Sequence, residues 1–237
     1  ISRKSKYLLF FFNKDIVMLV HLGMTGKFFF VNQKKTKYKT SFYYDINDEK
    51  DKKHNHIIFD LSNNQKLIYN DIRKFGFIKI IKRVNLDQNI HLKYLGPEPL
   101  SNKFNIEYFK NFISGKNRTI KDILMDQKFI SGLGNIYVNE ILFYSGLKPA
   151  KNVKKLTHVE IKKIIKFSKK IISKAISLGG SSIKDFSSSS GKKGSFQQHF
   201  SVYGKKGENC PRVKCKGKIK KIIIANRASF FCNRCQK

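Results

Sequence analysis

The N-terminal part of the chain alternates short apolar runs with brief polar breaks, a pattern typical of strands. The first two runs are separated by a turn signal, Asn13, Lys14 and Asp15. Short strands joined by short turns favour an antiparallel sandwich. The predicted strands are Lys6–Phe12, Ile16–His21, Phe28–Val31, Ile57–Leu61, Lys66–Tyr69 and Phe77–Ile81. We therefore expect an antiparallel β-sandwich domain over residues 1–97, with the polar, lysine-rich stretch 32–56 as a long exposed excursion.

Beyond a Pro-containing segment at Leu95–Leu100, the apolar positions recur at helical spacing. Thr157 and Glu160 form a capping box before the longest stripe, and a pair of glycines ends it. The predicted helices are Ile120–Leu124, Asn135–Ser145 and the stripe Ile161–Ile176. We expect a helical domain over residues 101–198 that closes with a flexible loop.

All four cysteines lie close to the C-terminal end, in two pairs. Four residues separate Cys210 from Cys215, two separate Cys232 from Cys235, and sixteen lie between the pairs. Two close pairs joined by a hairpin-sized spacer are typical of a tetrahedral Zn²⁺ site, whereas stapling by disulfides is typical of small secreted domains. The sequence therefore predicts one structural Zn²⁺ ion in a cationic hairpin domain over residues 199–237.

The charge of the chain restricts the class of partner. Against 49 Lys and Arg residues stand 16 Asp and Glu residues, which gives a formal net charge of +33. Such an excess favours a polyanion, either nucleic acid or an anionic membrane, although part of it reflects a composition rich in Lys, Ile and Asn. The sequence contains no apolar run as long as a membrane span, and Tyr7–Phe12 is too short for a signal peptide. We expect no membrane partner.

A glycine-rich turn precedes the predicted helix Asn135–Ser145. Gly132 and Gly134 bracket one residue, which allows a tight turn with exposed N–H groups at a helix N-terminus, an arrangement that binds phosphate. A Gly-x-Gly pattern more often marks an ordinary turn. The nearby cations that favour phosphate binding are Arg118, Lys121 and Lys128.

Several segments resemble the formamidopyrimidine-DNA glycosylases, in family order and over nearly the whole chain. Ile120–Gln127 followed by Gly132–Glu140 resembles the helix–two-turn–helix of that family. The other matching segments are His21–Gly26, Tyr69–Gly76, Leu95–Leu100, Gly179–Phe186, Val202–Gly207 and the cysteine hairpin. The resemblance implies a multidomain α+β fold with an N-terminal antiparallel β-sandwich, a helix–two-turn–helix domain with a lesion-capping loop, and a zinc-finger hairpin.

The resemblance also implies an enzyme of base excision repair. Members remove oxidised purines, such as 8-oxoguanine and formamidopyrimidine, from double-stranded DNA and nick the abasic site by β,δ-elimination. An extruded base leaves a hole in the duplex. Met24, Arg73 and Phe75 match the residues that fill it. A flexible thioether, a guanidinium facing the orphaned cytosine and an aromatic wedge suit that task.

Further roles follow from the resemblance residue by residue. Lys6 matches a lysine that binds phosphate and assists β-elimination, and Arg227 matches the arginine that holds the phosphates beside the lesion and serves δ-elimination. Lys184 and the loop Ser187–Phe196 match the segment that closes over the flipped base. The remaining predicted DNA-binding residues are His54, Lys121 and Asn135, which match family positions, and Arg118, which is added for its charge.

The chain departs from the family pattern at its start. The family's nucleophile is the amine of an N-terminal proline, followed by a glutamate; the amine attacks C1′ to form a Schiff base. This sequence begins with Ile1, Ser2 and Arg3, so we expect the nucleophile and the acid to be absent from it. Ile72 is a lesser departure, because the family usually has proline there. The four-residue first cysteine spacer is another.

Three other hypotheses stay open beside a glycosylase and abasic-site lyase. The chain could bind damaged or abasic DNA without excision, it could resemble endonuclease VIII and act on oxidised pyrimidines, or it could be a plain zinc-ribbon nucleic-acid binder. Met24, Arg73 and Phe75, together with Gly179–Phe186, favour the purine group. We expect a monomer in the bacterial cytoplasm, associated with the nucleoid.

Overall fold

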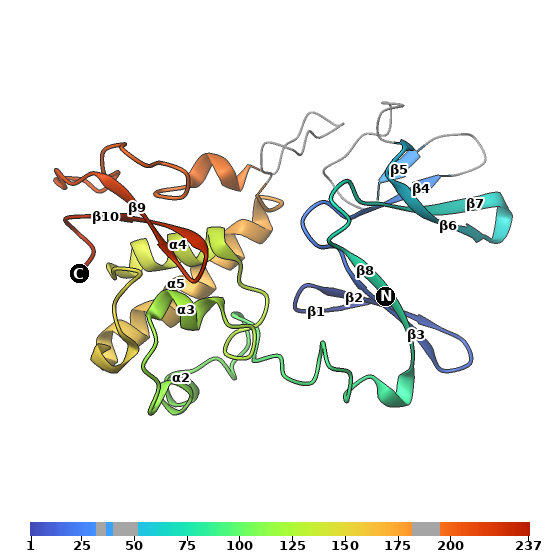
Figure 1. The fold of residues 1–237 in the computed structure, drawn as a ribbon, viewed down its shortest axis with the longest axis horizontal. Helices are drawn as coiled ribbons and strands as arrows, with labels where there is room; N and C mark the ends of the chain where they lie inside the picture. Colours follow the sequence, from blue (N-terminus) through green and yellow to red (C-terminus); the bar gives the residue numbers. More distant parts are fainter. Residues whose placement is uncertain (32–36, 40–51, 182–194) are drawn as a thin grey trace. The chain divides into compact units, whose positions relative to one another are not determined.

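The computed structural model describes residues 1–31, 37–39, 52–181 and 195–237. The chain divides into two compact units. The strand unit comprises residues 1–93 and 179–197, and the helical unit comprises residues 94–178 and 198–237. The ribbon in Figure 1 shows strands throughout the first unit, and helices with a C-terminal hairpin in the second. The predicted boundary at Leu95–Leu100 lies just beyond the end of the first stretch of the strand unit, while the helices and the cysteine hairpin share one unit.

The described part of the strand unit forms two four-stranded antiparallel sheets. The first has the order β1-β2-β3-β8 and the second the order β5-β4-β7-β6. The strands are β1 (Ser2–Lys4), β2 (Tyr7–Phe12), β3 (Ile16–His21), β4 (Lys27–Val31), β5 (Lys37–Lys39), β6 (Asn55–Leu61), β7 (Gln65–Asn70) and β8 (Phe77–Lys82).

Alternate side chains of these strands build the core of the strand unit. Met18 and Val20 are two residues apart on β3 and therefore face the same way. They pack with Phe28 of β4 and Tyr69 of β7 in one buried cluster. A cluster that joins strands of both sheets is the core of a sandwich, which confirms the predicted N-terminal β-sandwich.

The six predicted strands all exist; Ile16–His21 has the predicted bounds, and the other five differ by one or two residues at one or both ends. Lys6 was expected in the first strand, but it lies in the turn before β2, because Ser5 adopts a left-handed φ of 57° that ends β1. The three-residue strands β1 and β5 were not predicted, since their polar sequences show no apolar alternation. Within the predicted excursion 32–56, residues 32–36 and 40–51 lie outside the described residues.

Four α-helices and the cysteine hairpin make up most of the described helical unit (Figure 1). The helices are α2 (Ile106–Ile113), α3 (Ile120–Met125), α4 (Asn135–Ser145) and α5 (His158–Ser177), and the hairpin strands are β9 (Ile219–Ile224) and β10 (Arg227–Cys232). Short 3₁₀ turns lie at Ser62–Asn64 and Arg83–Asn85 in the strand unit and at Val153–Lys155 in the helical unit. A fourth, Phe196–His199, lies where the chain passes from the strand unit to the helical unit. The helix α4 packs against α5 on one side and against β10 on another, so it is the element on which the unit is built.

Local signals fix the ends of the two longer helices. Thr157 caps α5, and Thr157 and Glu160 form the predicted capping box. Gly146 adopts a left-handed φ of 77°, and its N–H donates to the carbonyls of Leu142 and Phe143, which ends α4 where predicted. The helix α2 was not predicted, although Asn105 caps it by accepting the N–H of Tyr108 at 2.9 Å.

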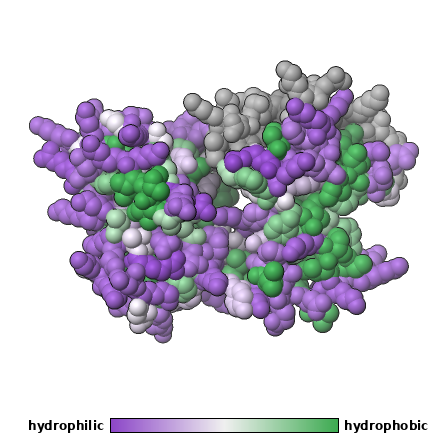
Figure 2. Space-filling view, viewed as in Figure 1, coloured by the Kyte–Doolittle hydropathy of each residue, from purple (hydrophilic) through white to green (hydrophobic). Residues whose placement is uncertain are grey.

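Figure 2 shows a mainly hydrophilic surface, with hydrophobic side chains gathered over the strands. The exposed apolar residues of the strand unit include Phe11, Phe12, Ile58 and Ile80. Among the described residues, no helix combines the length and the apolar character that a membrane span requires.

Candidate DNA-binding and metal sites

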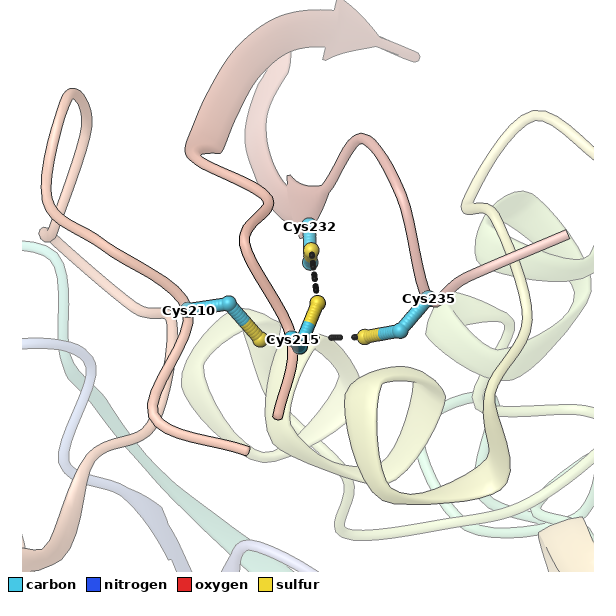
Figure 3. A group of neighbouring side chains, drawn as sticks. All are labelled: Cys210, Cys215, Cys232 and Cys235. Carbon is cyan, nitrogen blue, oxygen red and sulfur yellow. Dashed lines mark hydrogen bonds between the residues drawn. The ribbon is translucent and has the colours of Figure 1, made fainter. Parts of the chain in front are cut away.

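The four cysteines converge at the base of the β9–β10 hairpin (Figure 3). Their Sγ atoms all lie within 4.8 Å of one another. Cys210 and Cys235 are 3.7 Å apart, as are Cys215 and Cys232, so each contact joins the two sequence pairs. These distances are much longer than a disulfide bond of about 2 Å. They match the edge of a thiolate tetrahedron around Zn²⁺, about 3.8 Å for Zn–S bonds of about 2.3 Å.

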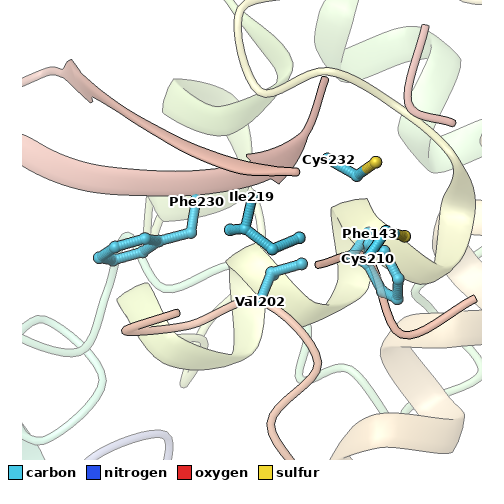
Figure 4. Packing of buried hydrophobic residues seen from close by; sticks show 6 residues of the cluster. All are labelled: Phe143, Val202, Cys210, Ile219, Phe230 and Cys232. Atoms are coloured by element: carbon cyan, nitrogen blue, oxygen red, sulfur yellow. The ribbon is translucent and has the colours of Figure 1, made fainter. Parts of the chain in front are cut away.

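The donor set and its surroundings fit a closed structural zinc site. Four thiolates leave no position for a substrate or water. Cys210 and Cys232 are buried and belong to an apolar cluster with Ile219, Phe230 and Phe143 (Figure 4). Phe143 comes from α4, so the cluster fastens the hairpin to that helix. Zinc would hold the two ends of the hairpin together beneath this core.

The longer first spacer has a structural use. Arg212 lies between Cys210 and Cys215 and donates to the carbonyls of Phe143 and Tyr144, at 3.2 Å for Tyr144. Its guanidinium also lies 4.7 Å from the centre of the Phe143 ring. A cation on the last carbonyls of a helix is favourable because these carbonyls form the negative end of the helix dipole. The departure from a two-residue spacer thus connects the metal site to the end of α4.

The glycine-rich turn before α4 is braced by one side chain. Gln127 accepts the N–H of Gly132 at 2.9 Å and donates to the carbonyl of Leu133 at 3.0 Å. Gly132 has a φ of 91°, and Gly134 is the N-cap of α4 with extended backbone. The first N–H groups of an α-helix have no intrahelical partner, so a braced turn that opens α4 is a suitable place for a phosphate.

Lys121, Asn135 and Arg227, which the resemblance implies are phosphate ligands, lie close together at this turn. The Nζ atom of Lys121 on α3 donates to Oδ1 of Asn135 at 2.6 Å. Asn135 Nδ2 donates to the carbonyl of Ala228 on β10 at 3.0 Å, which places the hairpin alongside the helix. Arg227 is the exposed first residue of β10 and lies close enough to act electrostatically on Lys121. We call Lys121, Asn135 and Arg227 the phosphate cradle, after the role that the resemblance implies; that role stays a prediction.

The hairpin turn is built to present Arg227. Ala225 and Asn226 have φ values of 47° and 57°, both left-handed. Two such residues make the tight turn that best matches the twist of two antiparallel strands. Arg227 follows directly and pairs with Ile224. The guanidinium is therefore carried on a rigid tip rather than on a loose loop.

Lys121 is an unusual lysine because it is only 1% exposed. Burial, with a smaller contribution from the positive charge of Arg227, lowers the pKa of Lys121 to about 7. Much of this lysine is therefore neutral in the free protein at neutral pH. A bound phosphate would stabilise the ammonium form and raise its pKa.

This shift predicts that DNA affinity falls as the pH rises. Binding must take up a proton at Lys121 once the pH exceeds its free pKa, so the affinity should drop by up to about tenfold per pH unit above about pH 7. Titration of labelled duplex DNA at fixed salt between about pH 6 and pH 9 measures the slope. Lys121→Met should bind more weakly at pH 6 and lose the slope. The control Lys128→Met, at an exposed lysine, should keep it.

Arg118 has partners that set it apart from the cradle. Its Nε donates to Asp122 at 2.6 Å and its Nη1 to Asp126 at 2.8 Å. The hydrogen bonds to Asp122 and Asp126 raise the pKa of this guanidinium despite its partial burial. Two carboxylates already balance its charge, which favours a role in fastening α3 to the following turn. Its predicted DNA contact stays a prediction.

The strand unit brings Met24, Arg73 and Phe75 together from two loops. Arg73 Nη1 lies 3.3 Å from Met24 Sδ, and the guanidinium carbon lies 4.6 Å from the centre of the Phe75 ring. Met24 and Phe75 are 53% and 55% exposed. Large apolar side chains held this far out are poorly explained as core, and an arginine between them is suited to enter a duplex. We call these residues the void-filling triad, after the role that the resemblance implies; that role stays a prediction.

The positions of the other predicted residues of the strand unit do not indicate a role in DNA binding. Lys6 is exposed in the turn between β1 and β2. His54 is half-buried just before β6, and its carbonyl accepts the N–H of Asp71 at 3.0 Å. Lys184 and most of the predicted capping loop lie outside the described residues. The roles assigned to all three stay predictions.

Sequence reasoning missed two buried polar residues on α4. Asn139 is 0% exposed; its Nδ2 donates to the carbonyl of Asn135 at 2.7 Å, and its Oδ1 accepts the N–H of Phe230 at 2.7 Å. Glu140 is 1% exposed and accepts three backbone N–H groups, from Ser201, Val202 and Tyr203, at 2.8–3.0 Å. The available signal was an Asn–Glu pair in an otherwise apolar helix, where uncompensated burial is costly.

Comparison with known proteins identifies the family. Three family models match the chain: the formamidopyrimidine-DNA glycosylase N-terminal domain over residues 1–78, the formamidopyrimidine-DNA glycosylase H2TH domain over residues 95–187, and the zinc finger found in FPG and IleRS over residues 207–237. The formamidopyrimidine-DNA glycosylase of Roseobacter denitrificans is 36% identical over 241 residues, which cover 100% of this chain and 82% of that protein. This chain belongs to the formamidopyrimidine-DNA glycosylase family.

Solved members of the formamidopyrimidine-DNA glycosylase family share the fold. A mutant of the Lactococcus lactis FPG, bound to DNA containing Fapy-dG, has a TM-score of 0.83 at 33% identity, covering 100% of this chain and 80% of that one. The Lactococcus lactis enzyme bound non-covalently to DNA with an AP site has a TM-score of 0.81 at 32% identity, with the same coverage. The predicted fold class and structural zinc site are confirmed.

Proposed function

We propose that this chain binds double-stranded DNA containing an oxidised purine or an abasic site, and that it serves base excision repair as a DNA glycosylase and abasic-site lyase. The observation that carries the proposal is the phosphate cradle. Lys121, Asn135 and Arg227 come from three separate elements and meet at a braced helix N-terminus beside the zinc hairpin. Family membership supplies the reaction class.

The two units would contribute different parts of the work. The phosphate cradle holds the DNA backbone without reading its sequence, which is what a protein searching for rare lesions needs. The void-filling triad supplies what replaces an extruded base, since the thioether, guanidinium and ring are adjacent and exposed. Zinc adds no chemistry to the reaction; when bound it fixes the four cysteines and, through β10, the position of Arg227.

Two residues are proposed to act on the abasic sugar. Lys6, on its exposed turn, would bind a phosphate and assist β-elimination. Arg227, on the hairpin tip, would hold the phosphates beside the lesion and stabilise the charge that develops on the departing phosphate in δ-elimination. We place this work in the cytoplasm, on nucleoid DNA.

The proposal is tested by DNA binding, because binding depends on residues that this chain carries. A duplex with a tetrahydrofuran abasic-site analogue should bind at least tenfold more tightly than the undamaged duplex, the cost of extrusion being lowest where the base is missing. Arg227→Ala should weaken binding to the abasic duplex and lower the slope of log affinity against log salt by about 1, the value for one phosphate contact.

The charge-matched control for Arg227→Ala is Lys220→Ala. Lys220 lies on the same hairpin, pairs with Phe231 and is exposed, but stands at the end near the cysteines. Lys220→Ala removes the same charge as Arg227→Ala, but at a position away from the cradle. The salt slope of this variant should therefore stay close to that of the parent chain. Equal binding of damaged and undamaged duplexes would refute the proposed function, and equal effects of the two substitutions would remove Arg227 from the cradle.

A further inference from the structure

The two loops that carry the void-filling triad are joined at one buried carboxylate. Residues 22–26 connect β3 to β4, and residues 71–76 connect β7 to β8. Asp71 is 0% exposed, and its Oδ1 accepts a hydrogen bond from Thr25 Oγ1 across the two loops. Thr25 Oγ1 in turn accepts the backbone N–H of Arg73 at 3.0 Å. One carboxylate and one hydroxyl therefore connect the loop of Met24 to the backbone of Arg73.

The second oxygen of Asp71 holds the far end of its own loop. Oδ2 accepts the N–H of Gly76 at 2.8 Å and the hydroxyl of Tyr69 at 3.1 Å. Burial by itself raises the pKa of Asp71, but the hydrogen bonds from Thr25, Gly76 and Tyr69 outweigh it and lower the pKa. The group is therefore a charged acceptor at neutral pH, and such hydrogen bonds are roughly twice as strong as neutral ones.

The backbone of Asp71 is fixed as firmly as its side chain. Its N–H donates to the carbonyl of His54 at 3.0 Å, and its carbonyl lies 2.8 Å from Nε2 of His56. Because a carbonyl oxygen only accepts, His56 carries its donated proton on Nε2. His54 directly precedes β6 and His56 lies at its start, so the backbone of Asp71 is anchored to the second sheet of the sandwich.

Close backbone approach leaves the loops little freedom. A Cβ on Gly23, which has a φ of 61°, would lie 2.6 Å from the carbonyl carbon of Phe75. A Cβ on Gly76 would lie 2.0 Å from the Tyr69 hydroxyl. Glycine is thus required at both positions, and the two loops touch through bare backbone. By contrast, the Arg73 side chain contacts only the Met24 thioether and the face of the Phe75 ring within the triad. Both groups lie at the surface, so these contacts restrain Arg73 less than the backbone contacts restrain the loops.

We propose that Asp71 is the positioning residue of the void-filling triad, acting through the Thr25 hydroxyl, and that it sets the preference for cytosine opposite the lesion. The inference rests on the proposed function. Cytosine offers two adjacent acceptors, N3 and O2, to the forked donors of Arg73, whereas adenine offers N1 beside an amino donor. Such a fork discriminates only if its backbone is fixed, and Asp71 fixes that backbone through Thr25.

The test uses the whole chain and tetrahydrofuran duplexes with cytosine or adenine opposite the analogue. The parent chain should favour cytosine. Asp71→Asn keeps the shape but replaces one acceptor oxygen by an NH₂ group, so the cytosine-to-adenine affinity ratio should fall about five- to tenfold toward unity, the lower part of the range for one bidentate contact. The control is Asp60→Asn, at an exposed carboxylate of the same unit paired with Lys66 at 2.9 Å, and it should leave the ratio unchanged.

A second pair of variants separates positioning from general destabilisation. Thr25→Val removes the hydroxyl at constant shape and should reduce the ratio, while Thr25→Ser retains the hydroxyl and should preserve it. A purely structural role would weaken both duplexes alike and leave the ratio in place. An unchanged ratio in folded Asp71→Asn or in Thr25→Val overturns the inference, and Thr25→Val decides alone if Asp71→Asn does not fold. A parent chain that ignores the abasic site would refute the proposed function instead.

Discussion

Removal of zinc is expected to weaken the binding of this chain to abasic-site DNA strongly. A two-stranded hairpin is marginally stable by itself in water, and zinc supplies about 10–16 kcal/mol to comparable small finger peptides at neutral pH. Cys232 ends the strand that begins with Arg227, so losing the metal frees the base of the strand that carries the guanidinium. We expect the affinity for the abasic duplex to fall more than tenfold, with DNA binding and released zinc followed in the same titration with a chelator.

Zinc added in excess should restore binding, because the thiols remain in place. Cys215→Ser provides the genetic counterpart: it should lower zinc content and abasic-site affinity together. The expected loss is local, since the sandwich core of the strand unit contains no cysteine among its described residues. Full affinity in a zinc-free, folded chain would mean that the apolar cluster around Phe230 alone positions Arg227.

Glu140→Gln is expected to destabilise the helical unit by about 3 kcal/mol. The buried carboxylate accepts the N–H groups of Ser201, Val202 and Tyr203, in the segment that leads into the hairpin. Glutamine has one acceptor oxygen, and its amino group would face a backbone donor. Hydrogen bonds to a charged group contribute about 1.5–3 kcal/mol each, and an unsatisfied buried N–H costs about as much.

Thermal unfolding measures this loss, which corresponds to a fall in Tm of about 6–12 °C for a protein of this size. The matched control is Glu208→Gln, at an exposed glutamate whose contact with Lys205 is 4.0 Å long, and its Tm should stay within about 2 °C. A Glu140→Gln variant as stable as the control would contradict the view that this carboxylate fastens the hairpin segment to α4.

Local chemistry explains why much of the fold could be predicted. The capping box at Thr157 and the left-handed Gly146 act within one helical turn, and the observed ends of α5 and α4 follow them. Alternation places Met18 and Val20 on one face of β3 in whatever sheet it joins. Where local signals are weak, as in the polar three-residue strand β1, sequence patterns predicted nothing.

The site residues likewise fall into those that local sequence patterns predict and those whose partners only the fold reveals. Cysteine spacing and residue type were enough to predict the zinc ligands, because close pairs define most of the tetrahedron locally. The sequence could not show that Arg118 is matched by Asp122 and Asp126, since either acid could equally have faced solvent. Nor could it show that the longer spacer carries Arg212 to the end of α4.

By itself the sequence predicted six strands of the sandwich, the helices α3, α4 and α5, the metal ligands and the family. Only the tertiary structure decided which polar groups meet across the fold. Thr25 and Asp71 are 46 residues apart, and Asn135 and Ala228 are 93 apart. No periodicity or motif encodes such pairs, because a buried polar group needs a partner with the right geometry and any chain segment can provide it. The packing of the fold brings these partners together. The Thr25–Asp71 pair holds the loops of the triad, and the Asn135–Ala228 pair holds the hairpin beside the cradle.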